Sequence, residues 1–171
     1  MIVVERTFAV TAAPGPVLGY LTDFGNTARW DPGVERITRR EPGPLAPGAS
    51  WHQARRVFGV TAELTYTLIT VAPDRLVLHG RNEGATCVDT VSVRPAGTGT
   101  EVTYRVELEL HGLAKLATSV LRVEFQKLGA ESAVRLTAAL NALAAAPRAT
   151  ELHFPSTPRN TAPSRSREAQ A

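Results

Sequence analysis

The order of hydrophobic periodicities along the chain limits its fold more than any single motif does. Residues 2–10 alternate apolar and polar side chains from Val4 onward, as expected for a half-buried strand. Two short helical stretches follow at about 14–21 and 23–30, and the period becomes helical again from Leu113 to Leu143. Between them lie six alternating segments, at about 34–41, 49–58, 60–71, 76–83, 85–95 and 101–111. The sequence therefore predicts an α+β fold in which seven strands form a curved antiparallel sheet around one long helix.

The turns between the last three strands predict a single buried face. The turn at 83–84 sets Leu78 opposite Asp89, and the turn at 97–99 sets Asp89 opposite Val106. Both registers give the same inward side chains: Leu76, Leu78, Cys87, Asp89, Val91, Val93, Val102, Tyr104, Val106, Leu108 and Leu110.

The long helix carries an apolar stripe at steps of three and four residues, which we expect to face the sheet. The stripe comprises Leu121, Phe125, Leu128, Ser132, Leu136, Ala139 and Leu143. The first turns carry a second apolar face of Leu113, Leu116 and Val120, which a loop, the cavity mouth or a partner could bury. Gly129 in mid-helix permits a bend or a close approach to a neighbour.

Composition indicates one domain, residues 1–145, followed by a tail. Residues 146–171 are rich in Pro, Ser and Arg and poor in apolar side chains, so we predict disorder there. Of the net charge of +3, the four arginines and two glutamates of the tail supply +2. The nearly neutral remainder does not suggest the clustered basic face of a nucleic-acid-binding protein, so no nucleic-acid partner is expected.

Several classes of location and chemistry lack support in the sequence. The single cysteine, Cys87, forms no internal disulfide, and no segment resembles a secretory signal or a membrane span, so we expect a cytoplasmic protein. No paired histidine or cysteine motif, nucleophile elbow, phosphate loop or dinucleotide fingerprint is present. We therefore expect no metal and no cofactor.

Asp89 is the main candidate for chemistry. A carboxyl group on an apolar face is costly unless it is hydrogen-bonded, paired or in contact with water in a cavity. Burial would raise its pKa and suit it to general acid or base catalysis. A structural hydrogen bond or ion pair, or a bulge that turns the side chain outward, is the alternative interpretation.

Aromatic and basic residues offer weaker candidates. Tyr66 and Tyr104 are in register with apolar neighbours, so their hydroxyls could reach a ligand or a partner at the rim. Trp30 and Trp51 are interpreted as packing anchors. Arg55 alternates with Trp51 and could supply a polar group to a pocket, but we favour reading it and Arg56 as surface charges.

Three segments add a family resemblance to this pattern. They are DFGN at 23–26, RWDPG at 29–33 and RPAGTGTEVTY at 94–104. Together with the order of elements over about 1–145, they resemble the START/Bet v 1-like (SRPBCC) superfamily, especially its polyketide cyclase/dehydrase branch. The resemblance implies a helix-grip fold; members include carriers of lipids and other apolar ligands, aromatase/cyclases and proteins without an assigned activity.

Three functions remain open at this stage. The first is binding of a small hydrophobic lipid-, polyketide- or aromatic-like molecule between sheet and helix. The second is a polyketide cyclase or dehydratase in which Asp89 and Tyr104 transfer protons, and the third is a homodimer or partner module built on the start of the long helix. The predicted ligand-lining residues are Leu64, Tyr66, Leu78, Asp89, Val91, Tyr104, Val106, Leu121 and Phe125.

Overall fold

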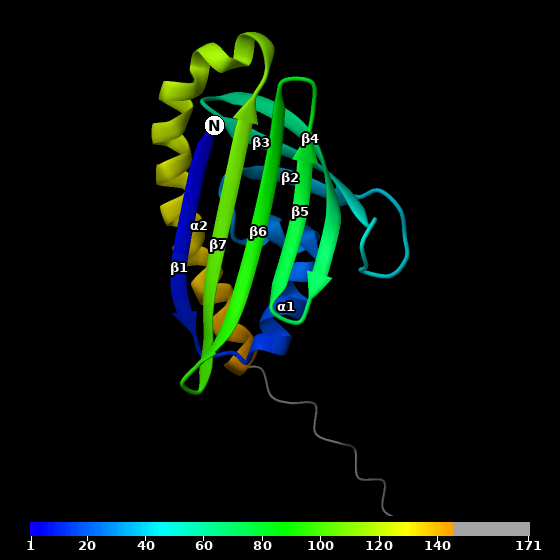
Figure 1. Ribbon diagram of the computed structural model, residues 1–171, viewed down its shortest axis with the longest axis vertical. Helices are drawn as coiled ribbons and strands as arrows, with labels where there is room; N and C mark the ends of the chain where they lie inside the picture. The colour runs from blue at the N-terminus through cyan, green and yellow to red at the C-terminus, as the bar shows by residue number, and fades with distance from the viewer. Residues whose placement is uncertain (146–171) are drawn as a thin grey trace, which may run out of the picture.

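A curved antiparallel sheet and one long helix dominate the structure, a computed structural model that describes residues 1–145 (Figure 1). The strands are β1 (Ile2–Val10), β2 (Val34–Arg39), β3 (Ser50–Val57), β4 (Val60–Ala72), β5 (Arg75–Arg81), β6 (Ala85–Ala96) and β7 (Gly99–Leu110). The helices are α1 (Pro14–Thr22), η1 (Phe24–Arg29), η2 (Gly112–Ala117) and α2 (Thr118–Ala145). The tail predicted to be disordered, 146–171, lies outside the described residues.

The strands lie in the order β1-β7-β6-β5-β4-β3-β2, so the N-terminal strand pairs with the last one. The two predicted registers are confirmed: Asp89 is opposite Leu78 on β5 and opposite Val106 on β7. The residues of the predicted inward face are buried or half-buried, and Asp89 itself is only 5% exposed. Alternation and turn position are therefore sufficient to orient this part of the sheet.

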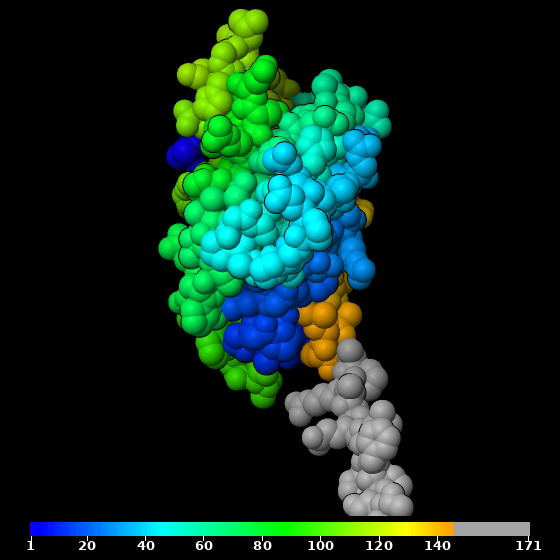
Figure 2. Space-filling model, turned by 90° about the vertical axis from the view of Figure 1, so that its right-hand side faces the viewer, coloured from blue at the N-terminus to red at the C-terminus, as the bar shows by residue number. Residues whose placement is uncertain are grey.

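The predicted helix from Leu113 is wrong at its beginning. Gly112, with φ of 54°, turns the chain out of β7, and a 3₁₀ helix, η2, precedes α2. Leu113 and Leu116 of η2 are 87% and 86% exposed, and Val120 in the first turn of α2 is also exposed. Figure 2 shows η2 projecting at one end of the molecule. Neither a loop nor the cavity mouth buries the second apolar face.

The other end of α2 is firmly packed. Leu136 and Leu140 are 1% and 0% exposed, and they belong to a cluster that includes Leu18 and Leu21 of α1 and Leu76 of β5. Leu140 is not part of the predicted stripe. Within the stripe, Leu136 is buried and the remaining members are half-buried. The most deeply buried apolar side chains of the helix thus lie in its C-terminal half.

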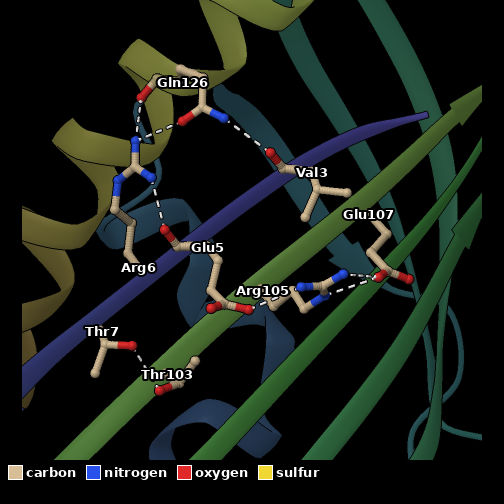
Figure 3. A network of polar contacts seen from close by, with 8 residues as sticks. All are labelled: Val3, Glu5, Arg6, Thr7, Thr103, Arg105, Glu107 and Gln126. Carbon is tan, nitrogen blue, oxygen red and sulfur yellow. Dashed lines mark hydrogen bonds and ion pairs between the residues drawn. The ribbon is translucent and has the colours of Figure 1, made fainter.

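Polar contacts attach the middle of α2 to β1 (Figure 3). The Arg6 guanidinium donates to the backbone oxygen of Gln126 at 3.0 Å and to its side-chain oxygen at 2.9 Å. The Gln126 amide in turn donates to the carbonyl of Val3 at 2.9 Å. On the opposite face of the sheet, Arg105 forms ion pairs with Glu5 and Glu107, so this face is polar. Among residues 1–145, no helix is long and apolar enough to cross a membrane.

Gly80 provides a test of the packing between β4 and β5. Tyr66 lies opposite it, and a Cβ atom at Gly80 would stand 2.5 Å from the Tyr66 ring. We predict that Gly80→Ala lowers the free energy of unfolding by about 1–3 kcal/mol, because overpacking displaces the ring. Urea denaturation measures this.

The matched control is Gly19→Ala. Gly19 lies in α1, and a Cβ atom added there would have no neighbour within 4 Å, so the new methyl group meets open space. Higher helix propensity should stabilise the chain by about 0.5–1 kcal/mol. Equal effects of the two substitutions would contradict the proposed tight fit of Tyr66 over Gly80.

Candidate functional site

The space between the concave face of the sheet and α2 is hollow in two places. The first, here called the polar cavity, has a volume of about 60 Å³, and the second, the apolar cavity, about 120 Å³. The polar cavity is lined by Val4, Arg6, Phe8, Trp30, Asp31, Arg55, Asp89, Tyr104, Val106, Phe125, Leu128, Gly129, Ser132, Ala133 and Leu136. The apolar cavity is lined by Arg55, Val57, Ala62, Leu64, Tyr66, Asn82, Ala85, Cys87, Leu108, Leu110, Leu121 and Phe125. Each volume is below the roughly 300–1,000 Å³ typical of ligand pockets.

Asp89 forms part of the floor of the polar cavity, where two side chains donate to its carboxyl group. The Tyr104 hydroxyl donates to Oδ2 at 2.7 Å, and the Cys87 thiol donates to Oδ1 at 3.1 Å. The strand register creates this arrangement. Cys87, Asp89 and Val91 are successive inward residues of β6, and Tyr104 on β7 lies opposite Val91, so its hydroxyl is diagonal to Asp89. The carboxyl group is therefore both hydrogen-bonded and at a cavity.

Burial sets the protonation behaviour of this cluster. Desolvation raises the pKa of Asp89, although the hydrogen bonds from Tyr104 and Cys87 and the charge of Arg55 oppose part of that effect. Burial also raises the pKa values of Tyr104 and Cys87 well above their ordinary values, and the Asp89 charge adds to both shifts. The hydroxyl and the thiol therefore keep their protons and act as donors.

Arg55 corrects one sequence interpretation. It is not a surface charge: its side chain is only 12% exposed, lines both cavities and forms an ion pair with Asp31 at 3.3 Å. Burial alone would lower the pKa of the guanidinium, but the Asp31 carboxylate raises it above its ordinary value. Arg56 does lie on the surface, where it pairs with Glu35.

Two residues that line the polar cavity carry a buried N–H donor without an acceptor in the described part of the chain. Neither Trp30 Nε1 nor Arg55 Nε has a hydrogen-bond partner within residues 1–145. Trp30 is 5% exposed and packs edge-on against Tyr104 with ring centroids 5.5 Å apart, so it is a packing anchor that also contributes a free N–H. Buried polar groups normally have a partner.

Gly129 brings α2 close to the sheet at the polar cavity. A Cβ atom there would lie 2.5 Å from Cγ1 of Val4 on β1. The close approach anticipated for this glycine is therefore present. Ser132 and Ala133, on the next turn, complete the helix side of the cavity with small side chains.

The nine predicted lining residues divide among three places. Asp89, Tyr104, Val106 and Phe125 line the polar cavity, while Leu64, Tyr66, Leu121 and again Phe125 line the apolar cavity. The remaining two, Leu78 and Val91, contact a small separate space beneath α1 and η1. The structure thus brings most of the predicted set to the groove, but in two compartments.

Sequence reasoning missed Arg6 and Asp31 as cavity residues. Arg6 shares the inward phase of Val4 and Phe8 on β1, so its alternation was a usable signal. Asp31 carries no periodic signal, because it follows η1 in a turn and reaches the site only through the packing of η1 against β2. Its backbone role is separate, since its Oδ1 accepts from the Gly33 amide at 2.8 Å.

Comparison with known proteins assigns the family. Residues 1–147 match the family described as "Polyketide cyclase / dehydrase and lipid transport". The chain therefore belongs to this family. A comparison with curated protein sequences finds no match.

Solved structures of low sequence identity share the helix-grip fold. A protein of Thermus thermophilus is 19% identical with a TM-score of 0.67, covering 85% of this chain and 99% of its own. The Zhui aromatase/cyclase from a Streptomyces species is 16% identical with a TM-score of 0.66, covering 87% and 97%. A START superfamily protein from Mycobacterium smegmatis is 15% identical with a TM-score of 0.61, covering 82% and 94%.

The raised pKa of Asp89 predicts a pH-dependent contribution to stability. A carboxyl group whose pKa is higher in the folded state favours folding fully below its unfolded pKa, near 3.9, and loses that contribution as pH rises through the folded pKa. Asp89→Asn removes this dependence. The stability of wild type relative to Asp89→Asn should therefore fall as pH rises from about 3 to 7.

Urea denaturation of both proteins across this range measures the difference. Exposed carboxyl groups titrate equally in both proteins, so the subtraction isolates Asp89. A difference that stays constant, or that rises with pH, would contradict burial as the dominant influence on this group.

Proposed function

We propose that this chain binds a small, largely apolar molecule carrying an oxygen acceptor in the groove between the sheet and α2. The observation that supports this most directly is that the polar cavity combines apolar walls with two residues, Trp30 and Arg55, whose buried N–H groups at Nε1 and Nε have no partner within residues 1–145. Ligand pockets commonly combine apolar walls with a few such polar groups. Lipid-, polyketide- and aromatic-like molecules all meet this description.

The charge of the polar cavity favours an oxygen-rich or anionic group. Arg6 and Arg55 bring two positive charges, and Asp31 brings one negative charge. Asp89 adds less negative charge than an exposed aspartate would, because burial raises its pKa. A ligand carbonyl, phenolate or carboxylate would accept hydrogen bonds here without displacing the Arg55–Asp31 ion pair.

Binding requires the groove to widen. Both cavities are small, but η2 and the first turn of α2 are weakly held, with Leu113, Leu116 and Val120 exposed. This end of α2 carries Leu121, which lines the apolar cavity. The C-terminal half of α2 remains anchored by Leu136 and Leu140. Movement of η2 and the first turn of α2, before the Gln126 attachment to β1, would enlarge the groove while the fold stays intact.

Ser132→Leu tests binding in the polar cavity. Ser132 lines this cavity from α2 and takes no part in the hydrogen bond between Tyr104 and Asp89, so we expect the larger side chain to fill the space and leave that pair in place. We predict that it weakens binding of anilinonaphthalene sulfonate, an apolar anionic probe, by about tenfold, equivalent to about 1.4 kcal/mol. Fluorescence titration measures the change.

Ala130→Leu is the matched control, because Ala130 is exposed on the same helix. It should leave the affinity unchanged. Equal loss in both variants would point to a general effect on the helix, and retention of affinity in Ser132→Leu would place the probe elsewhere; either result contradicts the proposal.

A second candidate function is proton-transfer catalysis of the cyclase or dehydratase kind. The supporting observation is the hydrogen bond of 2.7 Å between the Tyr104 hydroxyl and Asp89 at the cavity floor. The ionised Asp89 carboxylate can take a proton from one substrate atom and, as the neutral carboxylic acid, return it to another, and a raised pKa favours the acid form. The Tyr104 hydroxyl stabilises the carboxylate before and after this exchange. Arg55 would stabilise a developing enolate oxygen.

Asp89→Asn distinguishes catalysis from simple binding. If the chain is an enzyme of this kind, the substitution should lower turnover of a cyclisable polyketone by about 10²–10⁴-fold while changing its affinity little. A carrier would keep its binding and show no turnover in either form. Product analysis and titration with the same polyketone separate the two results, and unchanged turnover in Asp89→Asn would contradict the catalytic role.

The homodimer interpretation stays a prediction. It is supported by the exposure of Leu113, Leu116 and Val120 on one face of η2 and α2. Sedimentation of wild type and Leu116→Lys tests it; equal monomeric mass for both proteins would count against a dimer through this face.

A further inference from the structure

Two residues form the wall shared by the two cavities. Arg55 and Phe125 are common to both linings, and every other lining residue belongs to only one of the two cavities. The Arg55 guanidinium lies over the Phe125 ring, with 5.4 Å between its carbon and the ring centroid. A charged group and an aromatic face at this distance attract each other. The groove is therefore divided by a single stacked pair.

The two compartments differ in chemistry. The polar cavity is lined by charged or titratable side chains, Arg6, Asp31 and Asp89, that do not reach the apolar cavity. The apolar cavity is walled mainly by aliphatic side chains such as Leu64, Leu108 and Leu121. A molecule with one oxygenated end would place that end in the polar cavity. Its apolar remainder could extend into the second compartment only by passing the stacked pair.

The two members of the pair are not equally fixed. Arg55 is held on β3 by its ion pair with Asp31, and its terminal nitrogen lies close against Gly33. Phe125 lies on α2 beside Gln126, the residue that Arg6 and Val3 attach to β1 (Figure 3). This attachment holds the ring over the guanidinium when the helix is closed. Phe125 is thus the part of the wall that a substitution can remove without exposing a buried charge pair.

From this geometry we infer that Phe125 is a specificity-determining residue, whose ring limits the length of the molecule that the groove accepts. The inference rests on the proposed ligand-binding function and adds that the length of the ligand determines which molecules bind. With the ring in place, the polar cavity receives a compact molecule. Without it, the two cavities join into one elongated pocket with a polar end and an apolar end.

Straight-chain carboxylates from butanoate to dodecanoate are suitable probes, because they pair one anionic end with a tail of graded length. Each methylene group buried from water should raise affinity about fourfold. For wild type, this gain should stop once the tail reaches Phe125. For Phe125→Ala, it should continue, so dodecanoate binds at least about tenfold more tightly than to wild type while butanoate differs by less than about threefold.

Isothermal titration of each protein with the series measures these profiles. Leu121→Ala is the matched control, because Leu121 lines only the apolar cavity and not the polar one. Its truncation enlarges the apolar cavity without opening the wall. Its plateau should fall at the same chain length as that of wild type. Phe125→Leu keeps an apolar side chain and should give an intermediate plateau, which provides a second reading if the alanine variant proves unstable.

The outcomes separate this inference from the proposed function. If wild type binds short carboxylates but both Phe125 variants keep its plateau, or if Leu121→Ala shifts the plateau as far as Phe125→Ala does, the wall is not the determinant and the inference fails. If folded wild type and Phe125→Ala bind no member of the series, the ligand-binding proposal itself is contradicted. A shift confined to the Phe125 variants supports both.

Discussion

The ion pair between Arg55 and Asp31 shapes the interior of this protein. An arginine enclosed between a sheet and a helix is tolerated because a carboxylate at 3.3 Å compensates much of its lost hydration. With the guanidinium seated at the centre of the groove, α2 cannot collapse onto the sheet there, and space remains on both sides. The paired charges thus explain why a chain with an otherwise ordinary apolar core retains two cavities.

The rest of the architecture works around that central obstacle. Apolar packing closes the C-terminal end of α2 against α1 and β5, and the Arg6–Gln126 contacts attach its middle to β1. Beyond these points, η2 and the first turn of α2 carry apolar side chains that remain in contact with solvent. Firm attachment at one end and weak attachment at the other is a physical basis for a groove that opens without unfolding.

Much of the fold was predictable because it depends on local periodicity. The register of β5, β6 and β7 followed from two turns, and burial of Asp89 followed from the register. The start of the helix was not predictable in the same way, because Leu113 and Leu116 have helical spacing and yet lie in a 3₁₀ segment with no core to cover. Amphipathic spacing indicates which residues share a face, but not whether another element reaches that face.

The candidate site was predictable only where it lies on strands. Asp89 and Tyr104 emerge from alternation, and the same alternation pointed to Arg55, although adjacency to Arg56 made a surface reading attractive. Asp31 is different, since a turn after η1 carries it to the cavity and only tertiary packing shows that it neutralises Arg55. A buried arginine is stable only when a carboxylate compensates its charge, and here that carboxylate, Asp31, lies 24 residues away in the chain.

The position of Cys87 has a practical consequence. As the chain's single cysteine, it lines the apolar cavity with a protonated thiol that is almost wholly enclosed. Alkylating reagents consume the thiolate and need physical access, so in the closed state they should meet neither condition. The rate at which this one sulfur is alkylated would then report how often α2 moves away from the sheet. The thiol is thus an internal chemical probe of the opening of the groove.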